Sequence, residues 1–298
     1  MKFNDFKRLI DSNTLLPKEI STDVCLFFYK EWIKLTTDEG DCFDGFRSSA
    51  NSLMLTGATG TGKTFTVEKF AEILHLPFYI INCPELSPTG YKGSNLDVAM
   101  EGIEKAIHKY VAKTNDGKVR AVVLFDEFDK ITSSARDDSF KSSNIQYEFL
   151  SYITKGHIIP VFAGSFSSKY DQVVTKRSIG FGSTPLNVQP KSSEIEDFQD
   201  EAKQLGVIPE LVGRISCFKR MPDITEEYLH AILHYPNNQK LIEANKILNY
   251  AIGESFNLTE REKRAIIKRA LKMKLGVRGL HTVIEEKVNE KILGGNND

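Results

Sequence analysis

Short apolar runs alternate with polar or helix-like segments over the first 220 residues of the chain. The run at 121–125 is continuously apolar, as expected for a strand buried on both faces. Between runs, Leu96, Met100 and Ile103 repeat at helical spacing and predict an amphipathic helix. Strands alternating with helices predict an α/β fold, a mostly parallel sheet between two helix layers. The predicted strands cover residues 53–55, 78–81, 121–125, 158–163 and 215–218.

The pattern changes near residue 221, where strand signals stop and helical ones continue. Thr259 and Glu262 have the spacing of a capping box, and Gly276 stands where a helix would end. We therefore predict a large domain over 1–220, with a helical lead-in over 1–50, and a small, mainly helical domain over 221–298. The last helix carries an apolar stripe of Leu280, Val283, Ile284, Val288 and Ile292.

Charge and cysteine content narrow the class of protein. Lys plus Arg is 39 and Asp plus Glu is 40, so the net charge of −1 gives no global reason to bind nucleic acid. The four cysteines form no CxxC pair, which argues against a zinc ribbon and for reduced thiols. No apolar stretch is typical of a signal peptide or a membrane span, so we expect a cytoplasmic protein without a membrane partner.

A loop between the first strand and the next helix matches the phosphate-binding pattern G-x-x-x-x-G-K-[ST]. Its glycines let backbone N–H groups surround phosphates, and the following helix presents its positive N-terminus. Lys63 would reach the terminal phosphates, and the Thr64 hydroxyl would ligate Mg²⁺. The sequence thus predicts an ATP and magnesium site to which Phe65 also contributes. The loop comprises Gly57, Ala58, Thr59, Gly60, Thr61, Gly62, Lys63 and Thr64.

Two carboxylates follow the third apolar run. Asp126 stands at the tip of a strand, where it would hold Mg²⁺ through water or together with Thr64. The adjacent Glu127 would polarise the attacking water and is our candidate catalytic base.

Taken together, these motifs resemble the AAA+ ATPases, and most closely the ClpX type, the ATP-binding unfoldase subunit of the Clp protease. Residues 57–64 are similar to the Walker A loop of that family and 124–130 to its Walker B strand. The resemblance covers nearly the whole chain. It implies a P-loop NTPase large domain, a small helical domain, and an ATP hydrolase that has no peptidase activity of its own. It further implies a homo-oligomer, a hexameric ring, that acts on protein substrates with a ClpP-like peptidase.

Two loops resemble contact loops of the ClpX type. The Gly-Tyr-Lys-Gly segment around Tyr91 and Lys92 is similar to the aromatic pore loop that grips polypeptide in the ring channel. The segment with Ile179, Gly180 and Phe181 is similar to the loop that docks on the peptidase ring. Exposed apolar side chains in a polar loop also favour a contact role.

Two arginines complete the catalytic set that the resemblance implies. Arg214 ends a segment similar to the family's arginine finger, which would stabilise charge on the γ-phosphate held by the neighbouring subunit. Arg278, in Gly-Val-Arg-Gly-Leu, is similar to the sensor-2 arginine, which reaches the nucleotide from the small domain and couples its state to the domain angle.

The chain also departs from the pattern of the ClpX type. No segment here resembles the family's N-terminal zinc-binding domain, so we expect a protein that lacks it. Leu15-Leu16 stands near the place of the family's Val-Ile-Gly-Gln signature, which leaves the adenine contacts open. Pro160 lies inside the fourth predicted strand, where it has no backbone N–H to donate to a neighbouring strand. The sensor-1 position near 163–165 is therefore open as well.

Two other functions stay compatible with these motifs. A remodeller or regulator acting without a peptidase fits the missing zinc domain and the short loops, and binding to a ClpP-like peptidase separates it from an unfoldase. A nucleic-acid-associated AAA+ ATPase has the same fold, because fold does not fix function. The near-neutral charge and the Tyr91 loop speak against it, so we expect no nucleic-acid partner.

Overall fold

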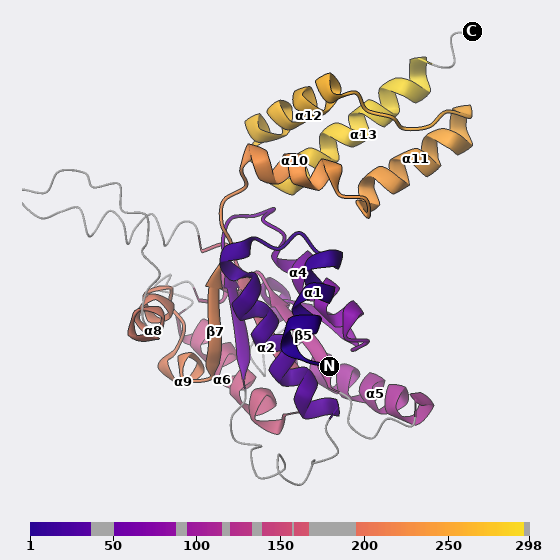
Figure 1. Ribbon diagram of the computed structural model, residues 1–298. Helices are drawn as coiled ribbons and strands as arrows, with labels where there is room; N and C mark the ends of the chain where they lie inside the picture. The colour runs from indigo at the N-terminus through magenta and orange to yellow at the C-terminus, as the bar shows by residue number, and fades with distance from the viewer. Residues whose placement is uncertain are drawn as a thin grey trace, which may run out of the picture.

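The computed structural model describes residues 1–36, 51–87, 94–114, 120–132, 139–156, 158–166 and 195–294. Its centre is a five-stranded sheet in the order β2-β5-β6-β1-β7, and every neighbouring pair of strands is parallel (Figure 1). The predicted strands are confirmed, each within a few residues of its expected range. They are β1 (Ser52–Thr56), β2 (Phe78–Asn82), β5 (Ala121–Asp126), β6 (Ile158–Gly164) and β7 (Ile215–Arg220).

Helices cover both faces of the sheet, which explains why its inner strands β1, β5 and β6 are mostly apolar and are buried over nearly their whole length. One face packs against α1 (Phe3–Asn13), α2 (Lys18–Thr36) and α4 (Lys63–Ile73), and this core includes Phe28 and Phe70. The other face packs against α5 (Leu96–Thr114) and α6 (Ser139–Lys155), with Phe125 and Phe149 in contact. On β5, Val122 and Leu124 face the first layer while Val123 and Phe125 face the second.

Shorter elements connect this framework. They are η1 (Cys83–Glu85), the two-stranded ladder of β3 (Leu86–Ser87) and β4 (Ser94–Asn95), η2 (Phe128–Lys130), α8 (Ile195–Gln204) and α9 (Pro209–Val212). Pro160 sits in β6 opposite Val123 of β5, and the pairing of β6 with β1 begins one residue later, at Val161. The proline thus precedes the part of β6 that is paired on both sides, so it does not interrupt the ladder with β1.

After β7 the described residues form helices only. These are α10 (Glu226–His234), α11 (Gln239–Ile252), α12 (Glu260–Met273) and α13 (Val277–Gly294). They share an apolar core of their own that includes Leu229, Leu248 and Ile284. The predicted capping box is present, because the Thr259 side chain accepts from the Glu262 N–H and the Glu262 carboxylate accepts from the Thr259 N–H.

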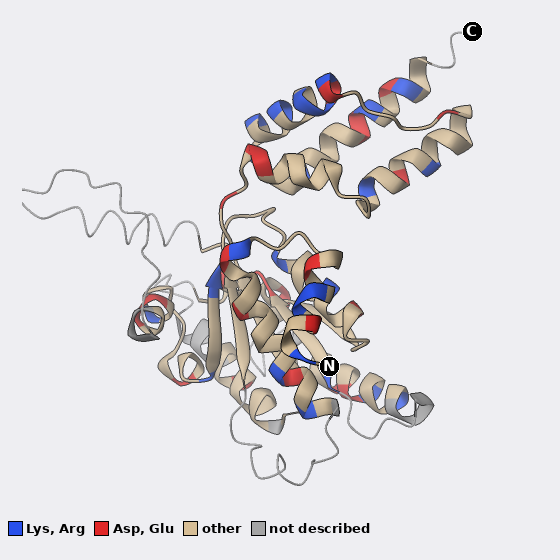
Figure 2. Ribbon diagram, viewed as in Figure 1, with Lys and Arg blue, Asp and Glu red and all other residues tan. Residues whose placement is uncertain are grey.

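The helical C-terminal part touches the sheet part by backbone as well as side chains. The Val277 N–H donates to the Gly60 carbonyl at 3.0 Å, and the Tyr228 hydroxyl donates to the Leu15 carbonyl at 2.6 Å. Acidic and basic residues are spread over both parts, with a concentration of Lys and Arg along α12 (Figure 2). None of the helices, within the part of the chain that the structure describes, has the length and apolar character needed to cross a membrane.

Candidate active site

The loop between β1 and α4 curls around the ammonium group of Lys63. Gly60 and Gly62 adopt positive φ angles of 80° and 90°, which side chains rarely tolerate. Lys63 Nζ donates to the Gly57 carbonyl at 2.7 Å and the Ala58 carbonyl at 3.0 Å. The first helical residue of α4 is Lys63 itself, so the positive end of the helix faces the loop. The loop therefore has the form of an anion-binding turn.

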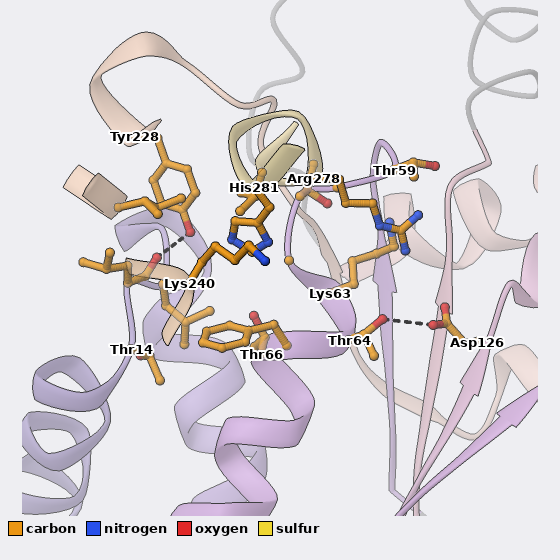
Figure 3. A pocket seen from close by; sticks show the side chains of 18 of the residues that line it. Thr14, Thr59, Lys63, Thr64, Thr66, Asp126, Tyr228, Lys240, Arg278 and His281 are labelled. Carbon is orange, nitrogen blue, oxygen red and sulfur yellow. Dashed lines mark hydrogen bonds between the residues drawn. The ribbon is translucent and has the colours of Figure 1, made fainter. Parts of the chain in front are cut away.

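The carboxyl end of β5 brings an acidic pair beside this loop. Thr64 Oγ1 donates to Asp126 Oδ2 at 2.9 Å, which joins α4 to β5 (Figure 3). Glu127 follows in the left-handed region (φ 53°, ψ 35°), and its N–H donates to Asp126 Oδ1 at 2.9 Å. A non-glycine residue in this conformation is uncommon and is often found at functional sites. Here it turns the chain so that Glu127 stays exposed while Phe128 is buried.

The charge of Lys63 is only partly compensated. The residue is 9% exposed, and burial lowers the pKa of its ammonium, with a further decrease from the nearby Arg278. Asp126 and Asp129 raise the same pKa, so they offset part of this effect. Because its hydrogen bonds go to neutral carbonyls, the ammonium can still pair with an anion in the loop. A phosphate there would offset the cost of burying this charge.

Asp129 fixes the end of β6 next to the acidic pair. Its carboxylate accepts from the Ser165 N–H at 3.1 Å and from Ser165 Oγ at 3.0 Å. Gly164, the residue before, leaves no room for a side chain, because a Cβ there would lie 2.6 Å from the Phe166 ring and 2.9 Å from Asp129. The serine hydroxyl is thereby held beside the loop at the carboxyl edge of the sheet, where parallel α/β sheets bind their ligands.

A cavity of about 470 Å³ lies between the two parts of the chain. At one end Arg278 of α13 points to the same space as Lys63 (Figure 3). At the other end, Tyr228, Lys240 and His281 come from three helices of the C-terminal part, and Leu15 and Leu16 from the turn between α1 and α2. The cavity thus has the Lys63 loop and Arg278 at one end and a mixture of apolar, aromatic and basic side chains at the other, and its size suits a nucleotide.

The structure brings most predicted site residues into this cavity. Asp126, Glu127, Arg278 and the seven residues from Thr59 to Phe65 line it. Gly57 and Ala58 contribute the carbonyls that hold Lys63. Arg214 does not line the cavity, because it precedes β7 at the amino edge of the sheet, where Nη1 donates to Thr154 Oγ1 at 2.7 Å. Tyr91, Lys92, Ile179, Gly180 and Phe181 lie outside the described residues.

The sequence analysis assigned no individual role to several lining residues. Asp129 and Ser165 could have been found from their places after β5 and β6, since the carboxyl ends of parallel strands meet at one edge. Tyr228, Lys240 and His281 carry no local signal. Only the packing of the C-terminal helices against the loop brings them to the cavity.

A parallel sheet between two helix layers, with a phosphate-binding loop at its carboxyl edge, is the α/β fold of AAA+ ATPases. Residues 53–177 match the family described as "ATPase family associated with various cellular activities (AAA)". The chain is also similar to the "ATP-dependent Clp protease ATP-binding subunit ClpX" of two bacteria. Identity is 22% for Porphyromonas gingivalis and 20% for Bacteroides fragilis, each match covering 94% of this chain and 74% of the relative. Family and relatives indicate an ATP hydrolase.

The contact between Gly60 and Gly276 gives a first testable prediction. Gly276 has φ +59°, and a Cβ there would lie 2.6 Å from the Gly60 carbonyl oxygen. We expect Gly276→Ala to push α13 away from the loop and to lower ATP turnover about tenfold or more, equivalent to ~1.4 kcal/mol or more in the barrier. Gly253→Ala is the matched control, because Gly253 has φ +73° but no atom within 4 Å of its Cβ position. Equally lowered turnover in the two variants would show that backbone strain, and not the contact with Gly60, is responsible. Wild-type turnover in Gly276→Ala would contradict the prediction.

Proposed function

We propose that this protein is an ATP-driven protein unfoldase that works as a ring with ATP bound between its two parts. The observation that carries the proposal is the joining of Lys63, the Thr64–Asp126 pair and Arg278 around one cavity. Lys63 and the Thr64–Asp126 pair belong to the sheet part of the chain, and Arg278 belongs to the helical C-terminal part. A nucleotide in the cavity would therefore set the angle between the parts, which is the basis of a motor.

The residues present suit ATP with Mg²⁺. Lys63 would bind the terminal phosphates, and the Thr64 hydroxyl with the Asp126 carboxylate offers the hard oxygen ligands that Mg²⁺ prefers. When bound, Mg²⁺ neutralises charge on the phosphates. Glu127 would accept a proton from the attacking water, and Ser165, held by Asp129, would orient a phosphate oxygen or that water. Arg278 would add positive charge from the C-terminal part.

The end of the cavity away from Lys63 suits the base of the nucleotide. Leu15, Leu16, Tyr228 and Ile232 line this end. The Tyr228 hydroxyl donates to the Leu15 carbonyl at 2.6 Å, so the turn between α1 and α2 forms one wall together with α10. We propose that these side chains provide the stacking and apolar contacts for adenine.

We also propose a division into a large domain over 1–220 and a small domain over 221–298, with the ATP site repeated around a hexameric ring. Its support is the separate apolar core of the C-terminal helices and the place of Arg214 outside its own cavity. A guanidinium at that edge could reach the site of a neighbouring subunit. The relatives are named as the ATP-binding subunit of the Clp protease, which supports a ClpP-like peptidase as the partner of the loop at 179–181.

The test of the unfoldase proposal uses Tyr91. We expect Tyr91→Ala to keep ATP turnover within about twofold but to lose at least ~90% of the unfolding of a stably folded substrate, because the tyrosine would grip polypeptide without touching the nucleotide. Unfolding is followed by loss of fluorescence of a tagged substrate. Tyr250→Ala is the control, since Tyr250 is 96% exposed on α11.

Unfolding that persists in Tyr91→Ala would contradict a pore mechanism. Intact ATP turnover in a wild-type chain that unfolds no substrate would favour a remodeller. Turnover that DNA stimulates in a salt-sensitive way would favour a nucleic-acid function.

A further inference from the structure

Two histidines and a glutamate meet on the surface of the C-terminal helices, away from the cavity described above. His230 and His234 stand one turn apart on α10, and Glu260 is the first residue of α12. Each offers one ligand atom, and these atoms all lie within 4.8 Å of one another. The two imidazole rings stack with centroids 4.1 Å apart. Residues four apart on a helix face the same way, so the spacing places both rings toward Glu260.

The hydrogen bonds of His234 present its second nitrogen to this cluster. Nδ1 lies 2.8 Å from the His230 carbonyl oxygen, which can only accept, so Nδ1 carries the proton. In the neutral imidazole Nε2 then carries the lone pair, and it lies 3.2 Å from Glu260 Oε1. Metal-binding histidines are oriented in this same way, by one ring N–H that donates to a carbonyl or carboxylate.

The ammonium group of Lys263 lies beside two of these three ligand residues. Lys263 Nζ lies 3.0 Å from His234 Nε2 and 2.8 Å from Glu260 Oε1. Its side chain is only 19% exposed, but the flexible four-carbon stem lets the ammonium swing out from the surface. The cluster thus has the lone pairs of a cation site, and Lys263 is a competitor within the chain for that site.

We propose that His230, His234 and Glu260 form a surface site for a divalent transition metal such as Zn²⁺. Two imidazole nitrogens and one carboxylate oxygen are a ligand set that zinc accepts, with water in the fourth position. This site is additional to the proposed ATP site. A bound ion would join the end of α10 to the start of α12, and α10 also carries Tyr228 and Ile232 of the nucleotide cavity. Metal binding would therefore stiffen the wall of that cavity.

The test is a calorimetric titration of the full chain, freed of metal by a chelator, with ZnCl₂. We expect one zinc per chain, with affinity at least about tenfold weaker in His230→Ala and in His234→Ala. His108→Ala is the control, because His108 is exposed on α5, away from the cluster. Lys263→Met should tighten binding, since it removes the competing ammonium. All of these side chains except Lys263 are exposed, so the variants should fold, and circular dichroism verifies this.

Cysteines are the main alternative ligands. Cys25, Cys83 and Cys217 are free thiols, two of them buried. Titration with Co²⁺ separates the two cases, because thiolate ligands give a strong charge-transfer absorption that imidazole and carboxylate ligands lack. We expect one Co²⁺ to bind per chain without this absorption. We also expect this binding to be lost in the double variant His230→Ala, His234→Ala. Any one of three results would overturn the proposal. These are thiolate absorption on binding Co²⁺, a zinc affinity that is unchanged in the double variant, and no binding at a tenfold excess of zinc.

Discussion

Replacing Glu127 by Gln is expected to abolish ATP turnover while leaving ATP binding intact. The side chain follows Asp126 at the tip of β5, and its exposed carboxylate lines the cavity beside the Thr64–Asp126 pair. Gln has the same shape but cannot take a proton from water. General-base groups contribute about 10²–10⁴-fold to rates, so we expect turnover to fall by at least ~100-fold. Phosphate release measures turnover, and a fluorescent ATP analogue measures binding.

Two further variants serve as controls for Glu127→Gln. Lys63→Ala should lose ATP binding as well as turnover, because it removes the ammonium that the Gly57 and Ala58 carbonyls hold in the loop. Glu68→Gln should retain both, since Glu68 is exposed on α4 and does not line the cavity. Weak binding in Glu127→Gln would indicate a role in holding the nucleotide. Turnover above about a tenth of the wild-type rate would mean that another group serves as the base.

The glycine-rich loop and the sheet were predictable because their signals are local. A strand buried on both faces is apolar at every position, and the loop needs glycine where φ is positive, as at Gly60 and Gly62. Because parallel strands end at one edge, the sequence also implied that Asp126 would meet Thr64, and the two side chains are hydrogen-bonded at 2.9 Å.

The rest of the cavity could not be predicted, because it depends on how the C-terminal helices pack. Nothing in their local sequence marks Tyr228, Lys240 and His281 as site residues. They line the cavity because the C-terminal helices pack over the loop, where the Val277 N–H donates to the Gly60 carbonyl. The cluster of His230, His234 and Glu260 on α10 and α12 also depends on helix packing. His230 and His234 have a recognisable spacing, but Glu260 joins them only because the core of the C-terminal helices aligns the two elements.

Arg214→Ala is expected to lower ATP turnover by roughly 10³-fold or more without weakening ATP binding, if it acts on a neighbouring subunit as an arginine finger. Its own cavity lacks this side chain, and its backbone is fixed by the Ser52 N–H and hydroxyl, which both donate to the Arg214 carbonyl. Thr154→Val is the matched control. It removes the hydroxyl to which the Arg214 guanidinium donates at 2.7 Å, but keeps the charge of the arginine. We expect this variant to retain turnover.

Mixing two inactive variants decides whether Arg214 acts between subunits. An Arg214→Ala subunit keeps the intact loop, and a Lys63→Ala subunit keeps the arginine. Where the two stand side by side in a ring, the loop of one and the arginine of the other would complete a site, so turnover should reappear on mixing. If Arg214 instead served only its own subunit, the mixture would stay inactive. If its role were the contact with Thr154, Thr154→Val would share the defect. Restored turnover would require both an oligomer and a shared site, which no measurement on a single chain can reveal.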